Sequence, residues 1–318
     1  MNPISNIEQL RELAWAFRAS RVLQVASKLE VFTILSQGPL TAREVAEHCE
    51  SNPEMTEKLL IACTAIGLTR FEGGRYRNSD LADLYLIRGK PFYQGNWIDH
   101  ASDLWDEWSN LERWIGGKKT SRKRGNGHRR FIMAMHDIAM GGEAEELASH
   151  MELKDGRLLF DVGGGPGTYS IILCKHNPQL RAVVFDLPET IPITREVIEK
   201  FGMSDRISIL KGNWNKDDFG QGNDVVLMSN VLHGPGSQAR MKLRKAFKSM
   251  TDGGLLIIRD FFLNETKTGP LSAALFNLMV GAYSIKEITS LIRNSEFVNI
   301  RELQIPHKTH SILLAEKH

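Results

Sequence analysis

A glycine-rich turn is the strongest chemical signal in the sequence. The apolar run Leu158–Val162 leads directly into Gly-Gly-Gly-Pro-Gly at positions 163–167, and Asp161 precedes the turn. Glycines at a turn from strand to helix let the backbone approach a ligand closely, at the edge where open α/β sheets bind their ligands. The turn therefore predicts a cofactor site.

The spacing of these glycines bears on the class of cofactor. The nicotinamide fingerprint Gly-x-Gly-x-x-Gly would need glycine at position 168, where Thr168 stands, and the observed spacing is Asp-x-Gly-x-Gly-x-Gly. Asp186, in Phe-Asp-Leu-Pro at 185–188, offers a carboxylate for two ribose hydroxyls. Its alternative role is to cap a helix. Together these residues indicate an adenosyl ligand, and the broken fingerprint disfavours nicotinamide.

Three further apolar runs end in residues that could act on a ligand. The first ends in Asn213-Trp214, which can place an amide against an adenine edge and an aromatic ring beside its face. The second ends at His233; histidine, with an unperturbed pKa of about 6.5, can take a proton from a phenol or an enol. Asp260, at the end of the third, is the candidate to orient that imidazole. The alternatives are a hydrogen-bonded wall histidine and a buried structural aspartate.

The elements that must position these residues alternate between strands and helices. Apolar runs that predict strands occur at Leu158–Val162, Ala182–Phe185, Ile207–Leu210, Val225–Met228 and Leu255–Ile258. Helical segments between them favour a parallel sheet with crossover helices. The last two runs, Phe297–Ile305 and Ser311–Ala315, are too close for a parallel crossover and must pair antiparallel. We expect a mostly parallel α/β sheet that ends in an antiparallel hairpin.

The first hundred residues predict a separate winged-helix domain. Amphipathic helices extend from about Ile7 to Leu35, and Thr41 with Glu44 can form a capping box for the next helix. Another helix opens near Asn52-Pro53, and Gly73-Gly74 supplies the tight turn of a hairpin. Between positions 53 and 67 Lys58 is the one basic residue, which disfavours DNA binding and favours packing or dimerisation.

A helical connector is expected at 101–155, between this domain at 1–100 and a catalytic domain at 156–318. It is rich in Trp and Met, which usually form core but can also line an aromatic pocket. The stretch Lys118–Arg130 has seven Lys or Arg and no acid, so a solvated loop is favoured over an anion-binding lid. Our candidates for the substrate pocket are Phe131, Met135, His136, Asn230, Phe276 and Met279.

Composition favours two globular domains and argues against several partners. The chain has 318 residues, about twice a usual domain. Its 40 Lys and Arg against 38 Asp and Glu give a net charge of +2, which disfavours nucleic acid or acidic lipid as a partner. Cys49, Cys63 and Cys174 form no Cys-x-x-Cys pair, so neither disulfides nor a metal site is expected. With no export signal or apolar run of about 18 residues, we expect a cytoplasmic protein with no membrane contact.

These motifs together resemble the S-adenosylmethionine-dependent O-methyltransferases of the plant caffeate and hydroxyneurosporene type. Asp-Val-Gly-Gly-Gly-Pro-Gly, Phe-Asp-Leu-Pro, Gly-Asn-Trp and a histidine after Ser-Asn-Val-Leu occur in the family's order, and the resemblance covers nearly the whole chain. It implies a class I methyltransferase, Rossmann-like catalytic domain behind a winged-helix dimerisation domain. It also implies a homodimer that methylates a hydroxyl of a small aromatic or enolic molecule.

The resemblance also implies a role for each matching residue. The methionine part of S-adenosylmethionine would lie on Gly163, Gly165 and Gly167, with Asp161 in the same site. Asp186 would contact the ribose. The adenine would contact Leu187, Asn213 and Trp214, and Ser229 would contact the amino-acid end.

Two departures from the family pattern keep other functions open. His233-Gly234-Pro235 replaces His-Asp-Trp, and the Gly-Gly-Lys-Glu-Arg-Thr-like segment, which carries a supporting carboxylate in plant members, is missing near Gly281. The altered motif is compatible with a hydroxylase or pericyclase that keeps the same fold and cofactor, or with a carbon or nitrogen acceptor. A winged-helix regulator that senses S-adenosylmethionine is the alternative from another class.

Overall fold

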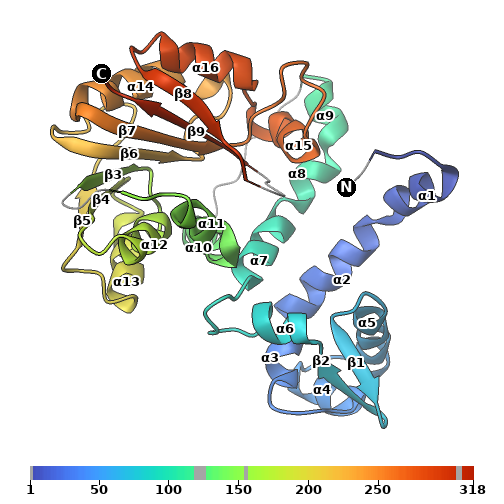
Figure 1. Ribbon diagram of the computed structural model, residues 1–318. Helices are drawn as coiled ribbons and strands as arrows, with labels where there is room; N and C mark the ends of the chain where they lie inside the picture. Colours follow the sequence, from blue (N-terminus) through green and yellow to red (C-terminus); the bar gives the residue numbers. More distant parts are fainter. Residues whose placement is uncertain (1–2, 118–126, 154–156, 306–309) are drawn as a thin grey trace. The chain divides into compact units, whose positions relative to one another are not determined.

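The computed structural model describes residues 3–117, 127–153, 157–305 and 310–318 (Figure 1). The chain divides into two compact units, 1–143 and 144–318, which we describe separately. The expected connector 101–155 spans that boundary. Most of the basic stretch Lys118–Arg130, for which a solvated loop is predicted, lies outside the described residues.

The first unit begins with the predicted helix-turn-helix and hairpin. Thr41 and Glu44 form the expected capping box, and the side chain of Asn52 caps the next helix ahead of Pro53. Gly73 and Gly74 both have positive φ, as a tight hairpin turn requires. The elements are α1 (Ile7–Trp15), α2 (Phe17–Lys28), α3 (Val31–Leu35), α4 (Ala42–His48), α5 (Pro53–Ala65), β1 (Thr69–Glu72), β2 (Arg75–Asn78) and α6 (Asp80–Tyr85).

The same unit continues in further helices, two of which are tied together by one buried carboxylate. Asp137 accepts hydrogen bonds from the backbone N–H groups of Asn96 and Trp97, at the start of a neighbouring helix. Burial raises the pKa of Asp137 to about 6. The helices are α7 (Gly95–Asp103), α8 (Trp105–Ser109), α9 (Leu111–Ile115) and α10 (His128–Ile138), followed by a π-helical turn at Ala139–Glu143.

The second unit is built on one sheet of the predicted kind. Its strands lie in the order β5-β4-β3-β6-β7-β9-β8; those from β5 to β7 are parallel, and β9 pairs antiparallel with both β7 and β8. The predicted terminal hairpin is therefore confirmed. The strands are β3 (Leu158–Val162), β4 (Arg181–Asp186), β5 (Ile207–Lys211), β6 (Asn223–Ser229), β7 (Met250–Asp260), β8 (Val298–Leu303) and β9 (Ser311–Glu316).

Helices cover both faces of this sheet. In Figure 1, α12 and α13 lie on one face and α14 and α16 on the other. Covered faces explain why the central strands are almost wholly apolar. The helices are α11 (Ala144–Ser149), α12 (Thr168–His176), α13 (Ile191–Lys200), α14 (Ala239–Ser249), α15 (Leu271–Val280) and α16 (Ile285–Arg293). No helix in the described ranges is long and apolar enough to cross a membrane.

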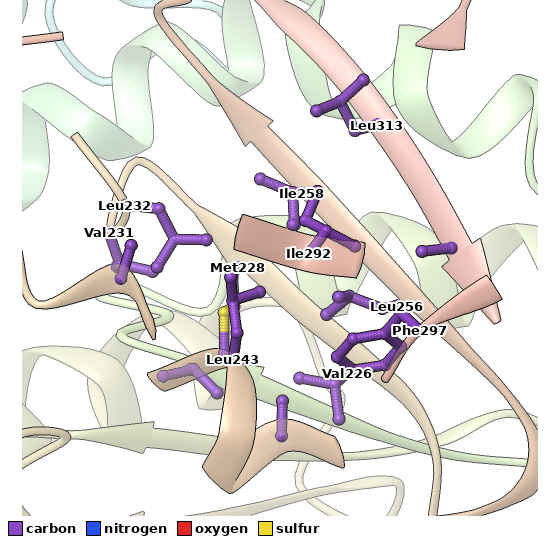
Figure 2. Packing of buried hydrophobic residues seen from close by; sticks show 14 of the residues in the cluster. Val226, Met228, Val231, Leu232, Leu243, Leu256, Ile258, Ile292, Phe297 and Leu313 are labelled. Atoms are coloured by element: carbon purple, nitrogen blue, oxygen red, sulfur yellow. The ribbon is translucent and has the colours of Figure 1, made fainter. Parts of the chain in front are cut away.

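The main core of this unit reaches the loop that follows β6. Figure 2 shows Val231 and Leu232 beside Met228 and Leu243, with Ile258 and other core side chains next to them. Leu232 is fully buried. The loop that leads to His233 is thus anchored in the core, which limits its freedom at the edge of the sheet.

Candidate active site

The glycine turn takes the backbone conformation that its sequence predicts. Gly163, Gly165 and Gly167 have φ values of 67°, 54° and 76°, in the left-handed region that glycine adopts without strain. A Cβ atom at Gly163 would lie 2.8 Å from Cγ1 of Val231 and 2.9 Å from Cζ3 of Trp214. A side chain is therefore excluded there, and backbone forms the surface of the turn.

Asp161 lies fully buried at the base of the turn. Its Oδ2 accepts a hydrogen bond of 2.7 Å from the Ser170 hydroxyl on α12, and a Cβ at Gly164 would lie 2.6 Å from the same oxygen. Burial raises the pKa of Asp161 to about 7, and the nearby Asp186 adds to the shift. The carboxylate ties the glycine turn to the first turns of α12.

Asp186 lies at the carboxyl end of β4 and contacts the turn directly. Its Oδ2 accepts a hydrogen bond of 2.7 Å from the backbone N–H of Gly165, and Oδ1 accepts one of 2.7 Å from Leu187. The side chain is almost fully buried. The fold thus fixes this carboxylate beside the turn, while Leu187 is half-buried next to it.

The Asn213-Trp214 pair follows β5 at the same edge of the sheet. The backbone N–H of Asn213 donates to Asp217, and its side-chain oxygen accepts from the N–H of Asn215. The ring of Trp214 packs against Gly163, as the glycine geometry above requires. The structure therefore brings the adenine and methionine candidates together after β5 and β3, the two strands that flank β4 in the sheet.

Ser229 and its neighbour Asn230 end β6. Arg259, the partner of Ser229 on β7, is buried, and its guanidinium donates to the Ser229 hydroxyl at 3.4 Å. Sequence reasoning missed Arg259, although one arginine in the apolar run Leu-Leu-Ile-Ile-Arg was a usable signal. Asn230 has a φ of 54°, and its amide oxygen is buried with no hydrogen-bond partner among the described residues. Such an atom fits a donor on a ligand.

His233 and Asp260 form the predicted pair. The Nδ1 atom of His233 lies 2.9 Å from Oδ1 of Asp260, which is fully buried, and the imidazole is 26% exposed. Backbone N–H groups of Leu232 and Phe261 also donate to this carboxylate. A carboxylate that holds Nδ1–H leaves Nε2 as the proton acceptor.

The two departures from the family motifs lie against each other. Gly234, which replaces the acid, has a φ of 35°, and a Cβ there would lie 2.7 Å from the carbonyl carbon of Gly281. Gly281 is where the expected segment is missing. The shorter connection between α15 and α16 therefore occupies the space that a side chain at position 234 would need. The two departures therefore meet at one close backbone contact.

Aromatic side chains surround the histidine on this side. Phe276, on α15, lies edge-on to His233 with ring centroids 5.0 Å apart, and it stacks on Phe261 at 4.2 Å. Met279 is half-buried on the same helix. Phe276 thus lies beside the histidine, whereas a substrate role for Phe276, Met279 and Asn230 stays a prediction.

The remaining pocket candidates belong to the first unit. Phe131, Met135 and His136 lie on α10, where the Phe131 ring is 42% exposed and lies edge-on to His100. Their part in a substrate pocket also stays a prediction. Across the described residues no group of three His, Cys, Asp or Glu could hold a metal ion.

Comparisons with known proteins agree with the class that this fold and site define, a class I methyltransferase. An O-methyltransferase dimerisation domain matches residues 11–88, and an O-methyltransferase domain matches residues 119–291. The 3-hydroxy-5-methyl-1-naphthoate 3-O-methyltransferase of Streptomyces sahachiroi is 30% identical, over 93% of this chain and 90% of that protein. The tetracenomycin polyketide synthesis 8-O-methyl transferase of Streptomyces glaucescens is 31% identical over 80% of this chain and 79% of its own length.

Solved structures support the same fold. Human N-acetylserotonin methyltransferase in complex with S-adenosylmethionine superposes with a TM-score of 0.85 at 22% identity, over 100% of this chain and 99% of that one. The chain belongs to the S-adenosylmethionine-dependent O-methyltransferases. It is an enzyme that uses this cofactor to methylate a hydroxyl, and the regulator and non-methylating alternatives are not favoured.

Proposed function

We propose that the acceptor is a planar aromatic phenol or enol and that His233 removes its proton during methyl transfer. The observation that carries this proposal is the His233–Asp260 pair at 2.9 Å, flanked by the stacked rings of Phe276 and Phe261. Two of the relatives above are named for aromatic hydroxyl acceptors, a naphthoate and a tetracenomycin intermediate. An aromatic wall favours a flat acceptor because offset and edge-to-face ring contacts add to simple burial.

The residues at the carboxyl edge fit S-adenosylmethionine. At Gly163 a Cβ would clash with its neighbours, so only backbone is available to the cofactor there. Asp186 is held beside Gly165, where its carboxylate can reach a ribose. Asn230 offers a buried amide oxygen to a donor on the cofactor or acceptor. When bound, the cofactor supplies an activated methyl group on a sulfonium with a good leaving group.

The protein therefore has to align the acceptor and manage one proton. Positioning alone can contribute about 7–11 kcal/mol, so Trp214 beside the cofactor turn and Phe276 beside His233 matter as much as the base. Nε2 of His233 accepts the hydroxyl proton as the oxygen attacks. Asp260 keeps Nδ1 protonated and stabilises the imidazolium that forms, in the manner of the aspartate in a serine protease triad.

The assembly that we propose is a homodimer. The dimerisation domain matches residues 11–88, and Leu10, Leu13 and Trp15 on α1 are each at least 44% exposed. Apolar side chains in such a cluster are typical of a protein interface. On α5, Glu54 pairs with Lys58, which argues against a DNA-binding helix. Two buried thiols, Cys63 and Cys174, support the proposal of a reducing, cytoplasmic location.

The test is to follow a labelled methyl group. Candidate phenols and enols are incubated with the enzyme and cofactor that carries a deuterated methyl group, and the products are mapped by mass spectrometry. We expect a gain of one labelled methyl on a hydroxyl oxygen. A methyl group on nitrogen or carbon, or an unlabelled oxygenated product, would contradict the proposal.

A further inference from the structure

A buried lysine lies behind the cofactor turn, and none of the roles above uses it. Lys242 is on α14, on the face of the sheet opposite α12 and α13 (Figure 1), and is 3% exposed. Its neighbours on the helix, Ala239, Leu243 and Ala246, are core residues. An apolar side chain of similar volume would be buried there at a lower cost in free energy, because an ammonium must be desolvated.

The ammonium of Lys242 contacts both walls of the glycine turn. Its Nζ donates a hydrogen bond of 2.8 Å to the carbonyl of Val231 and lies 5.2 Å from the ring centroid of Trp214. That distance is within the range of a cation–π interaction. Val231 and Trp214 are the two residues whose side chains a Cβ at Gly163 would meet. One cation therefore contacts both residues whose side chains lie against the turn, Val231 through its backbone carbonyl and Trp214 through its ring.

The same ammonium is coupled to the catalytic pair. Burial is the larger effect and lowers the pKa of Lys242 to about 8, while the charge of Asp260 acts in the opposite direction. Asp260 also accepts from Leu232, the residue after Val231, and binds His233. Lys242 and Asp260 thus hold the carbonyl and the N–H of the same peptide group, the one between Val231 and Leu232, in the loop that ends at the histidine.

We propose that Lys242 is a positioning residue for methyl transfer, which fixes Val231 and Trp214 against the cofactor turn and holds the loop that carries His233. The catalytic part of this inference rests on the proposed function, whereas the part that concerns cofactor binding does not. The side chain acts from behind the crevice, so we expect it to change cofactor affinity and turnover but not acceptor affinity.

Two substitutions separate its charge from its hydrogen bond. Lys242→Met keeps the length and removes both, and Lys242→Gln keeps a donor for Val231 without the cation over Trp214. Lys248→Met is the matched control, because Lys248 is exposed on the same helix. The readouts on the full chain are melting temperature, affinity for S-adenosylhomocysteine by calorimetry, and kcat and KM for the acceptor.

For Lys242→Met we expect cofactor affinity at least about fivefold weaker and kcat at least about tenfold lower, with KM for the acceptor within about twofold of wild type. The melting temperature should stay the same or rise, because a buried charge is lost. Relative to Lys242→Met, Lys242→Gln should restore kcat more fully than cofactor affinity, because it keeps the donor for Val231 but not the cation over Trp214. Lys248→Met should match wild type.

Other outcomes overturn the inference. If the Met and Gln variants both keep wild-type affinity and kcat, or change only the melting temperature, Lys242 is structural. If the Lys242→Met protein does not fold, Lys242→Gln alone tests the inference. A loss of cofactor affinity in the folded Gln variant supports it, and wild-type affinity overturns it. If His233→Gln is fully active while Lys242→Met binds cofactor weakly, the base role fails and the binding role of Lys242 stands.

Discussion

At the scale of single residues, charged groups at the crevice and behind it are buried and bonded to backbone. Asp186 accepts from Gly165, Asp260 accepts from Leu232, and Lys242 donates to Val231. Fixed charges of this kind do not have to reorganise during reaction, which is why they suit catalysis. Asp161 differs, because it accepts from a side chain, the Ser170 hydroxyl.

Asp161 gives a prediction about stability and pH. Its pKa of about 7 in the folded state lies above the usual value of about 3.9, so the folded protein binds this proton more tightly than the unfolded chain. Stability from this group is present at low pH and falls as pH rises from about 4 to 7. Asp161→Asn, which can still accept from Ser170, removes that dependence.

Without cofactor, we expect the melting temperature of Asp161→Asn minus that of wild type to increase from pH 5 to pH 8. The change should be at least about 1 kcal/mol, or about 2–4 °C for a domain of 150–250 residues. Calorimetric scans of both proteins at each pH measure it. A difference that does not vary with pH would show that Asp161 has an ordinary pKa.

Some of these residues could be predicted from the sequence and others could not. His233 and Asp260 follow apolar runs, and parallel strands bring their carboxyl ends to one edge. Lys242 lies in Arg-Met-Lys-Leu-Arg, a pattern typical of a solvated helix face, and its burial depends on tertiary packing. Arg259 is the last-but-one residue of a strand, so its burial depends on neighbouring elements too.

At the scale of elements, the strands are where the apolar runs predict them, and the boundary that differs most is the start of β7. β7 begins at Met250, whereas the sequence predicts a start at Leu255. The predicted start is late because a Gly253-Gly254 pair is typical of a turn. In the structure the end of the chain holds them in the sheet: Gly253 donates to the carbonyl of Lys317, and Lys317 donates to that of Gly254. Here the pairing with the end of the chain outweighs the tendency of a glycine pair to form a turn.

The contact between Gly234 and Gly281 predicts that the family's acid cannot be restored here. Gly234→Asp would put a Cβ 2.7 Å from the backbone of Gly281 at a φ of 35°, where side chains are strained. We expect a loss of about 1–3 kcal/mol in stability and a fall in kcat of at least tenfold, since the histidine loop must shift.

Gly236→Ala is the control for this substitution, because no atom lies within 4 Å of a Cβ there. It should melt and turn over like wild type. Thermal scans and steady-state kinetics compare the two variants. If Gly234→Asp gains activity, the carboxylate rather than the close contact governs this loop.

At the scale of the whole molecule, the chain combines a dimerisation domain with a methyltransferase domain. The residues for cofactor and base lie in the second unit, at one edge of its sheet. The first unit contributes the exposed apolar face of α1 and the proposed acceptor contacts Phe131, Met135 and His136 on α10.

The proposed homodimer predicts that a charge on α1 weakens assembly. Leu13 is 44% exposed, so Leu13→Asp should cost the monomer little while placing a charge in an apolar interface. We expect the dissociation constant of the dimer to rise at least about tenfold, measured by sedimentation equilibrium. The neighbouring Glu12→Ala is the control. Wild-type protein that is monomeric at micromolar concentration would contradict the proposal.

The central claim is that His233 accepts the acceptor's proton while the fold aligns the reactants. The most direct measurement is kcat of His233→Gln against wild type from pH 6 to pH 9, with S-adenosylhomocysteine affinity checked by calorimetry. We predict unchanged cofactor affinity and turnover lower by about 10²–10⁴, with a smaller loss for more acidic phenols, which need no base. Wild-type turnover should fall on acidification, because a protonated imidazole cannot accept a proton. A variant that keeps a third or more of wild-type turnover at every pH would show that alignment alone drives the reaction.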